Sequence, residues 1–254
     1  MPGRPAPAAG SARATPRWKR ILLKVSGEAF GDGAGRGLDG PNLALLADEI
    51  VAAHRLGIEV AVVNGGGNIL RGAEARLDGV TRATADTMGM LATVVNALAL
   101  QDVIESKGVA TRVLSAIEMR TVAEPYIRRR AMRHMEKGRI VILAGGSGHP
   151  YFSTDTTAAL RGLEVGAEVL LKGTKVDGVY DKDPKRSGDA KRFERISFEE
   201  VYAKRLKVMD RTAITMCQEN RLPIVVFDMG VTGNLVRLLG GEDVGTLVGF
   251  DAEG

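Results

Sequence analysis

Short apolar runs alternate with helical patterns along most of the chain, and this alternation constrains the fold more than any other feature. Val60–Val63 and Arg139–Leu143 are two such runs, and each ends in a glycine-rich loop, Gly65–Gly67 and Ala144–Phe152. Strands that are joined by helices run parallel, and the helices cover both faces of the sheet. The sequence therefore predicts an α/β fold, a three-layer αβα sandwich around a mainly parallel central sheet.

The glycine triplet after Val63 has two interpretations. A lone triplet favours a simple turn between a strand and a helix, but glycines also let a ligand approach the backbone N–H groups, which bind anions. The familiar fingerprints do not fit, because a dinucleotide G-x-G-x-x-G would need glycine at Leu70 and a Walker A loop would need lysine at Ala73. Arg71 lies about one helical turn beyond the triplet. It favours a phosphate loop, because its guanidinium can hold phosphate oxygens bidentately.

A lysine and the second glycine loop strengthen the phosphate interpretation. Lys24 interrupts the apolar strand Ile21–Val25 near its carboxyl end, where open α/β sheets bind ligands, although an edge strand would place the same lysine in solvent. After the second loop, Ser153–Asp155 opens a helix whose first turn offers N–H groups to an anion. Asp155 is either a capping acid or a carboxylate that organises lysines and metal around phosphates. Together these features predict a site for a polyanionic ligand.

Several further patterns leave alternatives open. Gly35–Gly40 matches G-x-G-x-x-G literally, but no strand precedes it directly, so we expect a flexible loop that could serve as a lid or regulatory segment. The helical pattern Ala83–Lys107 is apolar on nearly every side, which predicts burial on two faces, either in the core or at a subunit interface. Asp86 at its start is either a charge favoured by the helix dipole or an acceptor for a ribose hydroxyl. Asp177-Gly178 between β-branched residues predicts a hairpin.

The charge distribution argues against a nucleic-acid-binding protein. Of 35 lysines and arginines, five precede residue 21, and the other 30 nearly balance the 31 acidic residues. Only 4% of the residues are aromatic, so neither a basic face nor a stacking platform is evident. Residues 1–18, rich in Pro, Ala and Arg, are predicted to be a disordered tail, and residues 19–254 a single domain.

Three features of the sequence indicate the cellular compartment and the kinds of site to expect: its cysteine, its histidines and its apolar runs. A single cysteine, Cys217, excludes an intrachain disulfide and fits a reducing compartment. It lies in an apolar helical pattern, which favours a buried structural thiol over a nucleophile. The three histidines are scattered without metal-ligand spacing. No apolar run reaches membrane length and residues 1–18 lack the apolar segment of a signal peptide, so we expect a cytoplasmic protein without membrane or nucleic-acid partners.

Taken together, the motifs resemble those of the bacterial uridylate kinases of the amino acid kinase superfamily. They are Lys24–Ala29, Asn64–Asn68 with Arg71-Gly72, Asp86–Thr93, Gly148–Asp155, Lys172–Tyr180 and Lys207–Asp210. The resemblance extends from about Lys19 to Val248. Superfamily members that act on aspartate, glutamate or acetylglutamate share the glycine triplet and the Thr-Lys-Val-Asp-Gly-Val type of segment, but not the first and third motifs.

The resemblance implies an amino acid kinase-like fold, in which residues 19–165 bind the acceptor UMP and residues 166–254 bind ATP. It implies transfer of the ATP γ-phosphoryl group to UMP, with Mg²⁺ accompanying ATP and no protein metal ligands assigned. The implied catalytic residues are Lys24, Arg71, Asp155 and Asp210. The implied ATP-binding residues are Lys24, Val25, Ser26, Gly27, Gly67, Arg71, Thr174, Tyr180 and Asp183. The implied UMP-binding residues are Gly66, Asp86, Ser147, Gly148, His149, Pro150, Tyr151, Phe152, Ser153 and Thr154.

The resemblance also implies regulation and assembly. The family is hexameric, activated by GTP and inhibited by UTP, and its GTP-responsive segment corresponds to Asp32, Gly33, Ala34, Gly35, Arg36 and Gly37. Ser147 stands where the family more often has Thr and His149 where it often has Asn, and both can hydrogen-bond to uracil. An acceptor that is already a phosphate needs no general base, which agrees with a site that is rich in Gly, Lys and Arg and has no placed histidine.

Two alternatives stay open beside the uridylate kinase. One is a non-catalytic member of the same fold that binds a nucleotide or an oxyanion as a sensor or storage subunit. The other is a kinase for a different small acceptor, such as carbamate or an amino-acid carboxylate.

Overall fold

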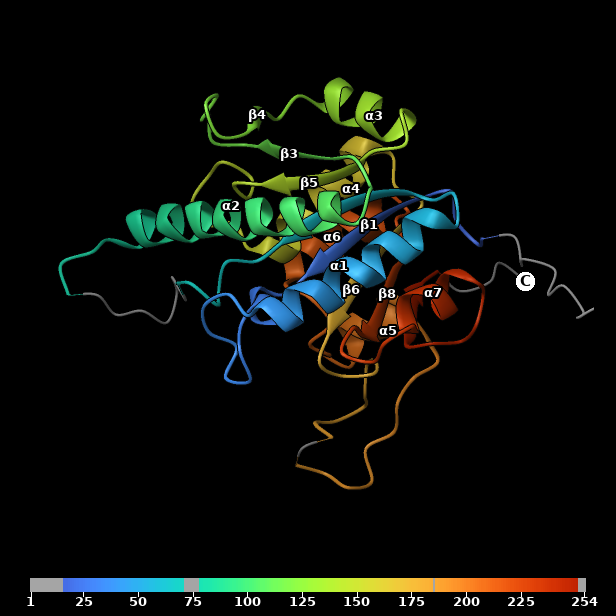
Figure 1. The fold of residues 1–254 in the computed structure, drawn as a ribbon. Coiled ribbons are helices and arrows are strands. Elements are labelled where there is room, and N and C mark those ends of the chain that lie inside the picture. The colour runs from blue at the N-terminus through green and yellow to red at the C-terminus, as the bar shows by residue number, and fades with distance from the viewer. Residues whose placement is uncertain (1–15, 71–77, 185, 251–254) are drawn as a thin grey trace, which may run out of the picture.

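A computed structural model describes residues 16–70, 78–184 and 186–250, and within them nine strands form a single sheet (Figure 1). The strands are β1 (Arg20–Val25), β2 (Glu59–Asn64), β3 (Thr111–Ser115), β4 (Glu124–Pro125), β5 (Ile140–Ala144), β6 (Val169–Thr174), β7 (Arg195–Ser197), β8 (Ile224–Asp228) and β9 (Thr246–Gly249). Their order is β4-β3-β5-β2-β1-β6-β8-β9-β7, and only the β8–β9 pair is antiparallel. The predicted mainly parallel sheet is confirmed.

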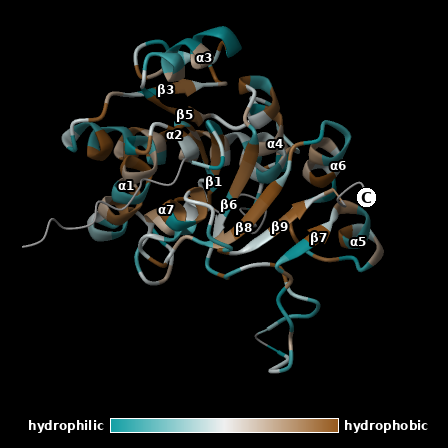
Figure 2. Cartoon of the chain, turned by 90° about the vertical axis from the view of Figure 1, so that its right-hand side faces the viewer, coloured by the Kyte–Doolittle hydropathy of each residue, from teal (hydrophilic) through white to brown (hydrophobic). Residues whose placement is uncertain are grey.

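Helices cover both faces of the sheet, which confirms the three-layer prediction. One face carries α1 (Gly40–Arg55), α2 (Arg82–Ser106) and α7 (Asn234–Leu239); the other carries α3 (Arg128–Glu136), α4 (Thr154–Val165), α5 (Phe198–Ala203) and α6 (Arg211–Glu219). A short 3-10 helix, η1 (Gly27–Phe30), follows β1. Figure 2 shows the apolar central strands between these helices.

Alternation within β1 explains why both faces are filled. Ile21, Leu23 and Val25 pack in the core beneath α1, α2 and α7, whereas Leu22 packs in the core beneath α4 and α6. All four side chains are at most 1% exposed. Because successive side chains point to opposite faces, Lys24 lies on the same face as Leu22, beneath α4.

Polar side chains mark where several helices begin. Asp39 caps α1, Ser153 caps α4 and Asp210 caps α6, each by accepting a backbone hydrogen bond from the first helical turn. Ser197 and Glu200 form a reciprocal capping box at α5, which has the spacing S-x-x-E. These caps fix the positions of the first turns of α4 and α6, which border the functional site.

The structure corrects two expectations. The predicted tail included Trp18, but this side chain is 9% exposed and belongs to the core, and the Arg17 N–H donates to Leu239 O, so ordered structure begins before residue 19. The Asp177-Gly178 hairpin is wrong. Val179 N donates instead to Thr246 Oγ1, so a contact with β9 overrides the local turn signal.

Helix α2 is exposed along one stripe. Met90, Val94 and Leu100 are buried, but Leu91 and Val95 are 44% and 47% exposed. Among the described residues, α2 is the one helix long and apolar enough to cross a membrane, yet 44% of its most apolar stretch is buried in the fold. The exposed stripe leaves the subunit-interface interpretation of this helix open.

Candidate functional site

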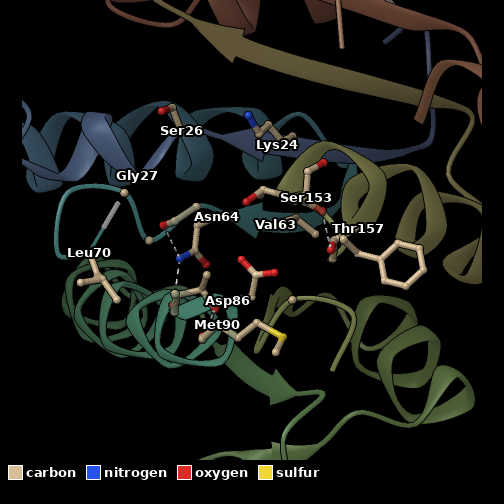
Figure 3. Close-up of a pocket in the computed structure, with 18 of the residues that line it drawn as sticks. Lys24, Ser26, Gly27, Val63, Asn64, Leu70, Asp86, Met90, Ser153 and Thr157 are labelled. Carbon is tan, nitrogen blue, oxygen red and sulfur yellow. Dashed lines mark hydrogen bonds between the residues drawn. The ribbon is translucent and has the colours of Figure 1, made fainter. Parts of the chain in front are cut away.

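Several strands end at one edge of the sheet, and the glycine-rich loops that follow them line a cavity of about 440 Å³ (Figure 3). Ser26 and Gly27 follow β1 there, Gly65–Gly67 follow β2, and Gly146 follows β5. The first turns of α2 and α4 close the other sides. The cavity therefore lies where open parallel sheets bind ligands.

Two lysines from neighbouring strands meet at one carboxylate beside this cavity. Lys24 of β1 is the register partner of Lys172 of β6. Lys24 Nζ lies 2.9 Å from Asp155 Oδ1, and Lys172 Nζ donates to Asp155 Oδ2 at 2.8 Å. The three side chains are only 12–16% exposed. The register of two parallel strands and the first turn of α4 thus build a partly buried cationic centre.

The charges of this centre influence one another. Burial raises the pKa of Asp155, but the attraction of Lys24 and Lys172 outweighs it and leaves that pKa below its ordinary value. Burial, together with the repulsion of Lys24, leaves the pKa of Lys172 below its usual value despite the opposing attraction of Asp155. Asp155 is the carboxylate that contacts both ammonium groups, and Asp210 attracts Lys172 as well. Lys24 and Lys172 thus present two partly buried positive charges that can attract an anionic ligand.

Asp210 joins α6 to α4 behind the lysines. Its carboxylate caps α6 by accepting from Ala213 N at 3.0 Å, and it accepts hydrogen bonds from the hydroxyls of Ser153 and Thr156. Lys172 Nζ donates to Val208 O at 2.7 Å, just before this cap. Asp210 therefore holds the first turn of α4, and with it Asp155, in place.

Asp86 faces the centre from α2, across the cavity in Figure 3. Its Oδ2 accepts from Tyr151 N at 2.8 Å and lies 3.6 Å from Arg82 Nε. Tyr151 has a φ of 71°, a left-handed conformation that is rare for a residue with a Cβ. Asp86 thus joins the start of α2 to the loop before α4, and its carboxylate reaches the cavity wall.

Glycine is required in the walls because the backbone segments pack closely. A Cβ at Gly66 would lie 2.7 Å from Gly89 O, and a Cβ at Gly27 would lie 2.5 Å from Gly67 N. Real Cβ atoms do not approach backbone atoms so closely. The loops after β1 and β2 therefore touch each other and α2 only because side chains are absent.

A second cavity of about 680 Å³ lies on the other side of Lys172. It is lined by Thr174, Tyr180 and Asp183, three of the predicted ATP-binding residues, and by the segment Lys204–Val208. Lys24 lines the first cavity and Lys172 the second, and Asp155 contacts both lysines. The cationic centre is therefore placed between two ligand-sized spaces.

The structure gathers most of the predicted site residues. The predicted residues that line the first cavity are Lys24, Ser26, Gly27, Gly66, Gly67, Asp86, Phe152, Ser153 and Thr154. Val25 is buried in the core, and Ser147, Gly148, His149, Pro150 and Tyr151 lie in the loop before α4 but do not line the cavity. Asp32 and Gly33 of the predicted regulatory segment line a separate cavity of about 260 Å³. Arg71 lies outside the described residues.

Sequence reasoning gave no role to Lys172, Asn64, Thr93 or Thr157, although these residues line the cavities. Lys172 could have been found, because Leu170-Leu171-Lys172 repeats Leu22-Leu23-Lys24. The other three are polar residues that follow or interrupt apolar patterns, and nothing local distinguishes them from ordinary buried polar side chains.

Comparison with known proteins places this geometry in a family. Residues 19–228 match the model of the amino acid kinase family. The solved structure of UMP kinase from Bacillus anthracis is 40% identical, with a TM-score of 0.90, over 92% of this chain and 97% of that one. UMP kinase from Ureaplasma parvum is 36% identical, with a TM-score of 0.87, over 92% of this chain and 99% of that one. The chain belongs to the amino acid kinase family.

Proposed function

We propose that this protein is a UMP kinase, which transfers the γ-phosphoryl group of ATP to UMP and releases UDP and ADP. The proposal rests chiefly on one observation, the pair Lys24–Lys172, which is bound to Asp155 and lies between two cavities. The similarity to two UMP kinases over 92% of the chain supports the same acceptor.

The acceptor UMP would occupy the first cavity, in the part of the chain formed by residues 19–165. Gly66 and Phe152–Thr154, which line this cavity, would bind it, and Ser147–Tyr151 of the same loop would contact it from outside the cavity wall. Asp86 would accept a hydrogen bond from a ribose hydroxyl. Asp86 suits this role because its carboxylate reaches the cavity from the start of α2. The wall between Phe152 and Thr154 suits a nucleotide, since it combines an aromatic ring with hydroxyl groups.

ATP would occupy the second cavity, in the part formed by residues 166–254. Thr174, Tyr180 and Asp183 would hold its nucleoside, because all three line that cavity. Its phosphates would reach Lys24 and the loop Val25–Gly27, with Gly67 and Arg71 beside the transferred group. The donor and acceptor phosphates would then meet over the cationic centre.

Transfer at such a centre requires alignment and charge neutralisation. UMP offers a phosphate oxygen that is already anionic, so no side chain has to remove a proton. Lys24 and Lys172 would neutralise charge on the transferred group, while Asp155 keeps the two ammonium groups together. Asp210 would act behind them by fixing the first turn of α4.

Mg²⁺ would accompany ATP in this scheme. Among the described residues, no group of three His, Cys, Asp or Glu side chains is arranged to hold a metal, and Asp155 is occupied by two lysines. Mg²⁺ is commonly held by substrate phosphates with few protein carboxylates, which fits these residues. The ion would supply further neutralisation of the ATP phosphates.

Regulation and assembly complete the proposal. GTP would activate through the segment Asp32–Gly37, UTP would inhibit, and the protein would form a homohexamer in the cytoplasm. The exposed apolar residues Leu91 and Val95 on α2 favour a subunit contact. The segment Asp32–Gly37 is suited to influence the reaction because it contacts the glycine loop through Asn68.

A coupled assay of ADP release tests the acceptor. Purified protein with Mg²⁺ and ATP is given UMP, CMP, dTMP, carbamate or aspartate in separate reactions. The proposal predicts turnover with UMP at least about 100-fold above that with the others, since a site built to bind the uracil and ribose edges rejects acceptors that lack them. Preference for carbamate or aspartate would indicate a different kinase, and no turnover with any acceptor would favour a binding protein.

A further inference from the structure

Three buried asparagines surround the loop Gly65–Gly67, and the proposed transfer assigns them no role. Asn64 ends β2, Asn68 follows the loop and Asn96 projects from α2. They are 1%, 5% and 0% exposed. A buried amide is costly unless it is hydrogen-bonded, so its partners indicate which parts of the fold it holds.

Asn68 and Asn96 form a closed amide pair. Asn96 Nδ2 donates to Asn68 Oδ1 at 2.7 Å, and Asn68 Nδ2 donates to Asn96 Oδ1 at 3.0 Å. Each nitrogen has a second acceptor: Asn96 Nδ2 donates to Gly65 O at 2.8 Å, and Asn68 Nδ2 donates to Gly37 O at 2.6 Å. All four amide protons are used, which fixes the orientation of both side chains.

The pair joins two loops that are distant in sequence. Gly37 N also donates to Asn68 O at 2.9 Å, so the backbone of Gly37 makes two hydrogen bonds with Asn68. At the other end, the Gly65 carbonyl accepts hydrogen bonds from Asn96 Nδ2 and, at 3.3 Å, from Asn64 Nδ2. Asn64 Nδ2 also donates to Thr93 O (Figure 3). The chain of contacts therefore runs from the loop Gly31–Gly37 to the glycine loop.

The Gly65 carbonyl orients the peptide that follows it. A trans peptide is planar, so its N–H points away from its C=O. Asn96 and Asn64 donate to this carbonyl and hold it toward α2, and the N–H of the same peptide belongs to Gly66, which lines the first cavity. A change of the carbonyl orientation would rotate that N–H away from an anion in the cavity.

We propose that Asn68 and Asn96 are positioning residues that hold the Gly66 N–H toward the acceptor phosphate and couple its orientation to the loop Gly31–Gly37. The expected effect on UMP turnover rests on the proposed function. The expected effect on the structure of the loops rests on the hydrogen bonds alone. Neither asparagine touches the reacting atoms. Their effect passes through the Gly65–Gly66 peptide.

The test compares Asn96→Leu with Ile104→Ala. Leu has nearly the shape of Asn but cannot donate to Gly65 O, whereas Ile104→Ala makes a cavity at the far end of the same helix, where Ile104 is fully buried. Both variants are expected to lower Tm. In Asn96→Leu, kcat and kcat/KM for UMP should fall together by about 10- to 100-fold, as expected when a transition-state contact is misplaced. Ile104→Ala should keep both within about twofold, because a cavity that leaves the site geometry unchanged affects stability alone.

Amide hydrogen exchange supplies a readout that does not depend on the reaction. Asn96→Leu and Asn68→Leu should speed exchange in the peptides that contain Gly31–Gly37 and Gly65–Leu70, and Ile104→Ala should not. Wild-type kcat in Asn96→Leu at a lowered Tm, or unchanged exchange in both peptides, would overturn the inference. If the wild-type protein does not phosphorylate UMP, the proposed function fails, and the exchange data still decide whether the asparagines hold the loop.

Discussion

Asp155 keeps together two ammonium groups that would otherwise repel each other across neighbouring strands. Replacing it by Asn preserves its shape and removes its charge, which leaves the Lys24 and Lys172 side chains, 12% and 15% exposed, without the carboxylate that contacts both of them. We expect Asp155→Asn to lower the free energy of unfolding by about 3–5 kcal/mol in urea titrations. The matched control is Asp189→Asn, whose ion pair with Lys182 is exposed and is worth at most about 1 kcal/mol. If both variants lost the same free energy of unfolding, Asp155 would not be stabilising a buried pair of lysines.

The same carboxylate makes stability depend on pH. Because folding lowers the pKa of Asp155, its ionisation stabilises the fold above its ordinary pKa of about 4, and this contribution is lost as the pH falls through the lowered value. The difference in unfolding free energy between wild type and Asp155→Asn should therefore be largest near neutral pH and shrink below about pH 4. If this difference in unfolding free energy stayed constant from pH 7 to pH 3, the ionised Asp155 would not be the group that stabilises the fold.

Cys217 lies in α6 close to this centre. Burial, with the negative charges of Asp155 and Asp210, raises the pKa of its thiol to about 12. The native protein should therefore not react with a disulfide reagent such as DTNB at pH 8, whereas the urea-unfolded protein should release one equivalent of product. Fast labelling of the folded protein, accompanied by loss of turnover, would show that this thiol is accessible to the site.

Helix α4 carries Asp155, the carboxylate that contacts both lysines, and Ser153 caps the first turn of this helix. Ser153→Ala removes the helix cap and one hydrogen bond to Asp210, so it should cost about 1–2 kcal/mol of stability and also lower kcat. Ser197→Ala removes a comparable cap from α5, and Ser197 lines neither the first nor the second cavity, so this change should lower stability without changing kcat. A parallel effect of both changes on kcat would refute the special role of the α4 cap.

Elements with a strong local pattern could be predicted from the sequence. Apolar periodicity predicted the strands and helices around the site, and the S-x-x-E spacing of Ser197 and Glu200 is the sequence signature of the capping box at α5. The contacts that override local preference could not be predicted. Val179 pairs with Thr246, a residue 67 positions away, and this contact replaced the hairpin suggested by Asp177-Gly178.

The site could be predicted only in part, because its geometry depends on strand register. The sequence indicates that Lys24 and Asp155 lie near strand and helix ends, but their meeting with Lys172 follows from the pairing of β1 with β6. The amide pair Asn68–Asn96 likewise forms only when α2 packs beside the glycine loop. Without the register and the packing, each of these residues has an ordinary structural explanation.

On the surface of the protein, α2 presents an apolar stripe to solvent. If the protein assembles through this stripe, the double change Leu91→Glu/Val95→Glu should reduce the mass measured by sedimentation, because buried carboxylates at an interface are strongly unfavourable. Val231→Glu, at an exposed residue beyond the end of β8, serves as the control and should not change the mass. An unaltered assembly in the double variant would place the subunit contact elsewhere.

In the proposed function, phosphoryl transfer to UMP takes place at the Lys24–Asp155–Lys172 centre. The most direct test incubates [γ-³²P]ATP, Mg²⁺ and UMP with the wild-type protein and with Lys24→Met, which leaves Asp155 paired with Lys172. We expect labelled UDP from the wild type and a rate at least about 100-fold lower from the folded variant. Labelled UDP at equal rates from both proteins, or label released as inorganic phosphate without UDP, would contradict it.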